Sequence, residues 1–153
     1  MAKTKFTSLS HYSQKPGLNS VGQYQMSGIP FLTGTTDGIG GQVTHKIEFP
    51  TVTKTITIIN TDTQTDADLR VHFAPSSSAP GVFKGHHYVT LQESNTSMTF
   101  NVKVREIFIS NNATAGGSRG SYDLVAELTG IPIDDAMFLT GSGISKVPGE
   151  TGY

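Results

Sequence analysis

The sequence predicts an all-β protein, a small antiparallel β-sandwich of about six strands, and two observations lead to this fold class. First, only 15% of the 153 residues are charged and 17 are glycine, a composition that favours strands and turns over helices. Second, runs of alternating apolar and polar residues recur between about residues 42 and 130, separated by turn-forming residues. A sandwich of the Ig-like or jelly-roll-like kind fits this spacing of short strands.

The clearest alternation runs from Thr96 to Ile109. Its phase changes by one residue at Arg105-Glu106, and a slip of one residue would turn every later side chain to the other face. We therefore expect a β-bulge or a bend at this point, within one long strand in the middle of the sandwich. The apolar residues on its two sides are Met98, Phe100, Val102 and Val104, then Ile107 and Ile109.

Five other stretches carry the same pattern and predict the remaining strands: 43–49, 54–60, 69–73, 88–92 and 121–128. In the first, His45 shares a face with apolar residues, which favours a core or edge histidine over a metal ligand. In the third, Arg70 and His72 are expected to point outward. One helical turn is expected near residues 132–137, where acidic residues suit a helix start.

The segments on both sides of the sandwich keep neither strand nor helix period. The sequence therefore predicts an extended N-terminal arm at 1–41, the β-sandwich domain at 42–130 and an extended C-terminal arm at 131–153. The run Phe-Leu-Thr-Gly occurs in each arm, at 31–34 and at 138–141. We expect the arms to pack along a neighbouring subunit or partner.

No candidate for catalysis survives inspection, so we predict no catalytic, cofactor-binding or metal-binding residues and no enzyme activity. His86 and His87 are adjacent, and neighbouring strand residues point to opposite faces. Asp62, Asp66 and Asp68 lack the glycine and the glutamate of a calcium loop. The glycine-rich stretch at 116–120 lacks the Gly-Lys-Ser/Thr end of a phosphate-binding loop.

Charge and hydropathy restrict the partners. The net charge is −1 and basic residues are offset by acidic ones, so the sequence predicts neither nucleic-acid nor membrane binding. No apolar run approaches the ~20 residues of a membrane-spanning helix. Cysteine is absent, so disulfide bonds are excluded.

Several runs together resemble small structural proteins of marine tailed phages, in particular those that infect cyanobacteria. These runs are 21–31, 52–58, 69–73, 85–89, 97–103, 126–132 and 139–143. The resemblance spans most of the chain and implies a place in the virion, on the capsid or at the neck and tail, after assembly in the host cytoplasm. It carries no active-site residue.

The first functional hypothesis is therefore a capsid-decorating protein that forms a homo-oligomer and binds the major capsid protein or other virion proteins through its arms. A neck, tail or baseplate component is the alternative within this class, and a carbohydrate-binding sandwich is the alternative outside it. Deletion of residues 1–30 is expected to leave a folded monomer that no longer joins the particle. The predicted partner contacts are Tyr24, Met26, Phe31, Leu32, Met137, Phe138 and Leu139.

Overall fold

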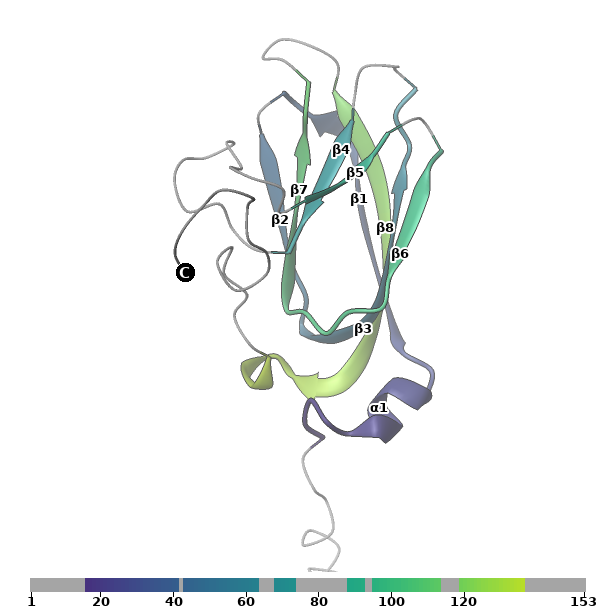
Figure 1. Ribbon diagram of the computed structural model, residues 1–153, viewed down its shortest axis with the longest axis vertical. Helices are drawn as coiled ribbons and strands as arrows, with labels where there is room; N and C mark the ends of the chain where they lie inside the picture. Colours follow the sequence, from purple (N-terminus) through teal and green to yellow (C-terminus); the bar gives the residue numbers. More distant parts are fainter. Residues whose placement is uncertain are drawn as a thin grey trace, which may run out of the picture.

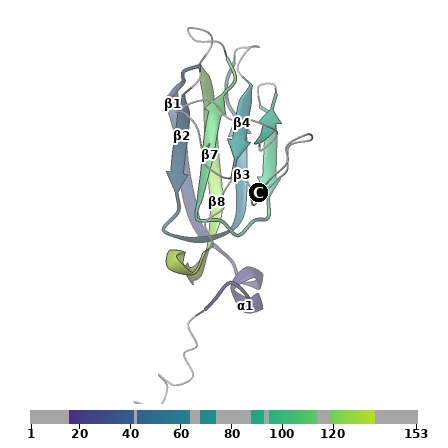
Figure 2. The same ribbon diagram turned by 60° about the vertical axis from the view of Figure 1, so that its left-hand side comes forward.

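The protein is a two-layer β-sandwich, as the composition and alternation predict (Figures 1 and 2). The computed structural model describes residues 16–41, 43–63, 68–73, 88–92, 95–113 and 119–136. Within these ranges the chain forms eight strands, one short helix and one 3-10 turn. Every strand pair is antiparallel, and the described strands divide equally between the two sheets.

The first sheet, called sheet A, is centred on the longest strand. That strand, β8, pairs with β1 on one side and with β3 on the other, and β6 completes the sheet. Its burial alternates strictly from Tyr122 to Leu128, which is the pattern of a strand with one face in the core and one in solvent. The strands in spatial order are β1 (Ile29–Ile39), β8 (Gly120–Pro132), β3 (Thr51–Asn60) and β6 (Ser97–Phe100).

The second sheet, sheet B, covers the inner face of sheet A. Its strands in spatial order are β2 (Thr44–Glu48), β7 (Glu106–Asn111), β4 (Leu69–His72) and β5 (Tyr88–Leu91). The inward side chains of both sheets form the main core, with Ile56, Ile58 and Leu124 from sheet A and Val71 and Ile109 from sheet B. Figure 2 shows β1 and β2 along the same side of the sandwich.

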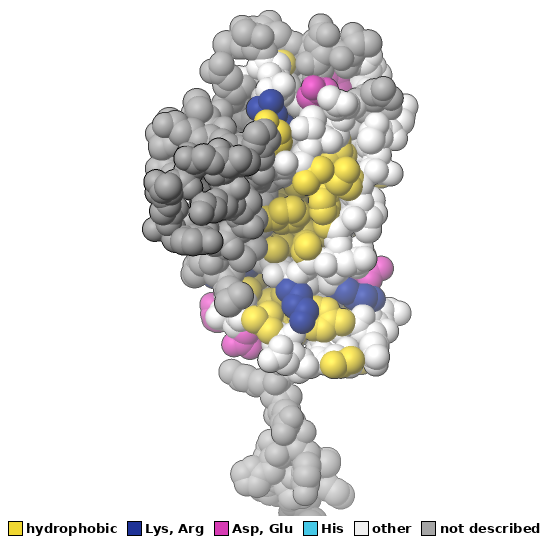
Figure 3. Space-filling view, in the orientation of Figure 1, with side chains coloured by type: hydrophobic (Ala, Val, Ile, Leu, Met, Phe, Trp, Pro, Cys, Tyr) yellow, Lys and Arg dark blue, Asp and Glu magenta, His cyan; other side chains and the backbone are white. Residues whose placement is uncertain are grey.

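The side of the sandwich bordered by β5 and β6 is less completely covered. Phe73, Met98, Phe100 and Val102 are only partly buried where they pack against the main core. The rings of Phe73 and Phe100 meet edge to face, with their centroids 5.2 Å apart. Figure 3 views the molecule from this side and shows hydrophobic side chains gathered in its middle.

A second, smaller hydrophobic cluster closes one end of the sandwich. Val52, Ile131 and Ala136 are buried there, and Leu18 and Tyr24 pack against them. The helix α1 (Val21–Gln25) and the 3-10 turn η2 (Ile133–Asp135) lie at this end (Figure 1). The turn confirms the single helical turn predicted near residues 132–137.

The stretch from Thr96 to Ile109 is not one long strand, so this prediction is wrong. Its first part is β6, at the edge of sheet A, and its last part is β7, inside sheet B. Residues 101–105 cross between the sheets. The Thr53 hydroxyl donates a hydrogen bond to the Val102 carbonyl over 2.6 Å and accepts one from the Val104 N–H over 3.0 Å. The alternation changes phase at Arg105-Glu106 because the chain has changed sheets there.

Part of the predicted N-terminal arm belongs to the sandwich. Residues 29–39 form β1, which pairs with β8 from Ile29 opposite Leu128 to Thr35 opposite Tyr122. Phe31 faces inward, where its ring lies 5.3 Å from that of Phe49. The sequence pattern missed this strand because Pro30, Gly34 and Gly38 interrupt it. At the other end, β8 extends to Pro132, beyond the predicted boundary at residue 130.

The two histidines of sheet B differ from each other. His45 lies half-buried on the edge strand β2, with the Tyr122 hydroxyl 3.4 Å from its Nδ1, in agreement with the predicted core or edge role. His72 is on the outward face of β4 as predicted, but it is completely buried rather than exposed. Its Nε2 lies 2.7 Å from the Ser110 hydroxyl on the neighbouring strand β7.

Candidate interaction surface

The segment that carries α1 is fixed to the end of the sandwich by polar contacts. The Lys103 ammonium lies 4.3 Å from the centre of the Tyr24 ring and donates a hydrogen bond to the Leu18 carbonyl over 2.7 Å. The Gly130 N–H donates to the Gln23 side-chain oxygen over 2.9 Å. Desolvation by burial raises the pKa of the Tyr24 hydroxyl above its usual value, as expected for a ring packed against the fold.

Lys54 fixes the chain between α1 and β1. Its ammonium donates to the Met26 carbonyl over 3.0 Å and forms an ion pair with Glu127 at 2.9 Å. Glu127 in turn lies opposite Pro30 in the β1–β8 register. Gly28 passes so close to β8 that an added Cβ would lie 2.5 Å from the Glu127 Cβ. The backbone from residue 26 to the start of β1 is therefore held tightly against sheet A.

The segment from α1 to β1 exposes most of the large hydrophobic side chains on the described surface. Its exposed fractions are 66% for Val21, 65% for Met26, 60% for Ile29 and 71% for Leu32, and Val125 on the neighbouring strand β8 is 40% exposed. Val125 lies opposite Leu32 on β8. We call these five residues the N-terminal apolar surface. Exposed hydrophobic side chains concentrated on one segment indicate an interaction site more strongly than scattered ones do.

The predicted partner contacts divide into three groups. Met26 and Leu32 belong to the N-terminal apolar surface and are free to contact a partner. Tyr24 and Phe31 instead pack within the chain's own fold. Met137, Phe138 and Leu139 lie outside the described residues, so the second Phe-Leu-Thr-Gly run cannot be compared with the first.

Val21, Ile29 and Val125 were not among the predicted partner contacts. Val125 follows from the alternation of β8, which turns every second residue outward. Nothing in the local pattern separates Tyr24 from Met26, because their difference arises from the way α1 docks on the sandwich.

Replacing Tyr24 by alanine is therefore expected to lower the free energy of unfolding by about 1–2 kcal/mol, because packing and the contact with Lys103 are both lost. Replacing Met26 by alanine should change it by less than about 0.5 kcal/mol, because an exposed side chain makes few contacts. Urea unfolding of both variants measures the difference. Equal losses would show that α1 does not dock as described.

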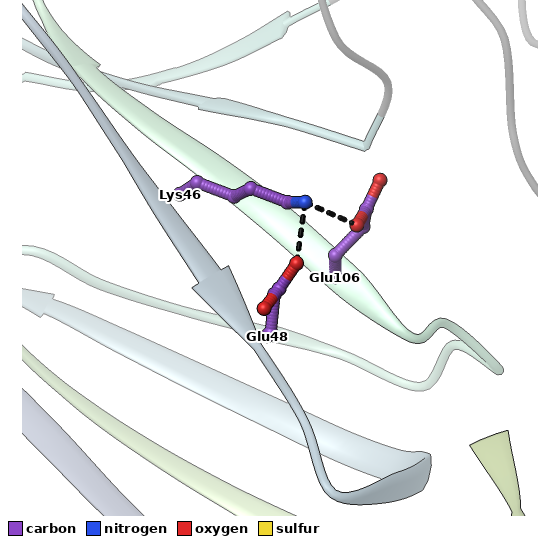
Figure 4. Close-up of polar contacts among 3 residues, drawn as sticks. All are labelled: Lys46, Glu48 and Glu106. Carbon is purple, nitrogen blue, oxygen red and sulfur yellow. Dashed lines mark hydrogen bonds and ion pairs between the residues drawn. The ribbon is translucent and has the colours of Figure 1, made fainter.

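The outward face of sheet B carries a charged cluster near its β2 edge. The Lys46 ammonium contacts the carboxylate of Glu48 on its own strand at 2.5 Å and that of Glu106 on β7 at 3.0 Å (Figure 4). The hydrogen bonds to Glu48 and then to Glu106 raise the pKa of Lys46, and the bond from Lys46 lowers the pKa of Glu48. Because Lys46 and Glu48 are largely exposed, solvent weakens this cluster, and we assign it no large stabilising role.

The contact between His72 and Ser110 joins residue types that can form a nucleophile and its base. Both side chains are buried, with exposed fractions of 0% for His72 and 4% for Ser110. Arg70 and Tyr88 continue this polar face, with the guanidinium carbon 4.3 Å from the centre of the Tyr88 ring. The arrangement joins β4, β5 and β7 and serves the packing of sheet B.

Within the described ranges, no three His, Asp or Glu side chains gather closely enough to hold a metal ion. His86, His87 and Asp66 lie outside those ranges, as does the glycine-rich stretch at 116–118.

Burial raises the pKa of the Tyr122 hydroxyl, which faces His45 between the sheets.

The fold and this surface define the protein as an all-β sandwich with an exposed apolar segment at one edge. No family model, curated protein or solved structure matches the chain. Among the described residues, no helix is long and apolar enough to cross a membrane.

Proposed function

We propose that this protein is a structural subunit of a virion, and that it decorates the capsid by binding neighbouring subunits. The observation that carries the proposal is the N-terminal apolar surface, where Val21, Met26, Ile29 and Leu32 are each more than half exposed. Exposure of large apolar side chains to water is unfavourable, and burying them against a partner lowers the free energy. A subunit of an assembly has such a partner.

Two further observations support a structural role. The surface stands on a well-packed scaffold, since the sandwich has two hydrophobic clusters and α1 is fixed to its end. A rigid scaffold lowers the entropy lost when a protein is built into an assembly. The resemblance to small structural proteins of marine tailed phages supplies the class of assembly, because those proteins are virion components.

The position in the particle can be tested by counting copies. Quantitative mass spectrometry of purified particles should find on the order of hundreds of copies for a capsid-decorating protein, which repeats over the lattice. A count of about six or twelve would instead indicate a ring at the neck, tail or baseplate, according to the rotational symmetry of such rings. Absence from purified particles would contradict the virion role.

The contribution of the apolar surface can be tested by incorporation into particles. The double variant Met26→Ser, Leu32→Ser should remain folded and fail to join particles, because both side chains are exposed and lie outside the core. The matched control is Thr57→Ser, Thr99→Ser on the same outward face of sheet A, which should join normally. A glycan array that binds the purified wild type would favour the carbohydrate-binding alternative.

A further inference from the structure

The four strands at the edges of the two described sheets differ in their capacity to pair with another chain. β5 and β6 have 4 residues each and β2 has 5, whereas β1 has 11. β2 also carries Lys46 and Glu48, charges of the kind that protect an edge from pairing (Figure 4). β1 carries a single charge, Asp37. It is therefore by far the longest edge strand of the described fold, and its one charge lies near its C-terminal end.

On the side away from β8, β1 presents backbone groups that another strand can use. Proline has no N–H, so inside a sheet it belongs where that position faces away from the neighbouring strand. Pro30 therefore turns its backbone away from β8, and the alternate residues Leu32 and Gly34 do the same. No other strand among the described residues pairs with this side of β1. The edge thus offers N–H and C=O groups of Leu32 and Gly34 together with the Pro30 carbonyl.

We propose that two copies of this chain join by antiparallel pairing of their β1 strands, with Leu32 of each copy opposite Leu32 of the other. In this register the two Leu32 residues exchange a pair of backbone hydrogen bonds. Each Gly34 N–H donates to the Pro30 carbonyl of the other copy, and this pair makes only one hydrogen bond because proline has no N–H to return. Sheet A then continues across a two-fold axis.

The chemistry of β1 favours a second copy as the occupant. Asp37 stands away from the centre of this register, so the two copies bring no like charges directly opposite each other. On the outward face, the exposed Leu32 and Val125 of one copy meet those of the other and form one continuous apolar row. Gly34 lies opposite Pro30 and leaves room at the positions next to this row. Such self-complementarity is what a two-fold interface requires.

This pairing rests on the proposed role as an assembly subunit, and the absence of cysteine makes it directly testable. In the variant Leu32→Cys the only thiol lies at the proposed axis, where directly opposite residues have Cβ atoms about 4.5–5.5 Å apart. Mild oxidation should convert most of this variant to a covalent dimer. The control Thr99→Cys places an exposed thiol on β6, at the opposite edge of sheet A, and should stay monomeric under the same conditions.

Sedimentation of the unmodified protein provides the second measurement. At a protein concentration of about 100 μM, the wild type should sediment as a dimer, which requires a dissociation constant below about that concentration. Leu32→Lys should weaken the dimer by about tenfold or more, because it sets two like charges opposite each other, and should leave the unfolding midpoint unchanged. A monomeric wild type, or equal oxidation of both cysteine variants, would overturn the pairing.

These outcomes are distinct from those that test the proposed function. A monomer that is found in purified particles would overturn the β1 pairing alone. A dimer that is absent from particles would overturn the virion role and leave the pairing intact.

Discussion

Replacing Leu124 by alanine is expected to lower the free energy of unfolding by about 2–5 kcal/mol, the range for large-to-small substitutions in a core. Leu124 is 1% exposed on β8, the strand that joins β1 and β3. It lies opposite Thr33 on one side and Ile58 on the other. The shortened side chain would leave a cavity between the sheets that neighbouring strands cannot close.

The matched control is the next residue along the strand. Val125→Ala removes an apolar side chain that is 40% exposed on the opposite face, and should change stability by less than about 0.5 kcal/mol. Urea unfolding of the two variants gives both values under the same conditions. If Val125→Ala were the costlier change, β8 would be turned the other way and the assignment of the core face would fail.

Replacing Gly38 by valine is expected to be comparably harmful, for two independent reasons. Gly38 has a φ of 71°, a conformation that costs a residue with a side chain about 1–3 kcal/mol. An added Cβ would also lie 2.6 Å from the Arg119 Cβ, and such crowding costs about 1–3 kcal/mol more. The pairing of β1 with β8 shifts register between Thr35 and Ile39 at this point. The glycine therefore permits the irregularity that brings Ile39 into the core.

A second glycine provides the control of opposite sign. Gly22 lies in α1, and an added Cβ would meet nothing within 4 Å. Because glycine is a poor helix former, Gly22→Ala should leave stability unchanged or raise it by up to about 1 kcal/mol. Thermal unfolding of the Gly38→Val and Gly22→Ala variants separates the two cases. A harmless Gly38→Val would show that β1 reaches the core without this glycine.

Regular alternation was enough to locate most strands. β3, β4 and β5 lie close to the predicted stretches, and β8 matches the pattern from Tyr122 to Leu128. These strands bury one face and expose the other, so their side chains record the environment residue by residue. The acidic residues before Ala136 likewise indicated the 3-10 turn at Ile133–Asp135.

The pattern failed where long-range contacts decide the conformation. β1 lacks a clear alternation, yet it forms because β8 supplies the hydrogen-bonding partner along most of its length. The division of the Thr96–Ile109 stretch into β6 and β7 depends on Thr53, which holds the crossing segment from a strand about fifty residues earlier. His72 alternates like an exposed residue, and only its surroundings in sheet B show that it is buried.

The candidate interaction surface was predicted only in part. Met26 and Leu32 were chosen for their apolar character and their position before the sandwich, and both are exposed. Tyr24 and Phe31 had the same apparent qualifications. They differ because α1 turns Tyr24 onto the small cluster at the end of the sandwich, and because β1 turns Phe31 towards Phe49.

The sequence by itself determined the class of fold and the strands whose two faces have different environments, because alternation along a strand is a local property of the chain. Tertiary structure alone decided which residues before Gln42 belong to the sandwich and which are left exposed. An edge strand such as β1 is stabilised by backbone pairing with a strand some ninety residues away, and backbone hydrogen bonds leave no signature in the side chains. For the same reason the position of β1 at the edge of the described sheet, where we propose that a second copy binds, became visible only when the order of the strands was known.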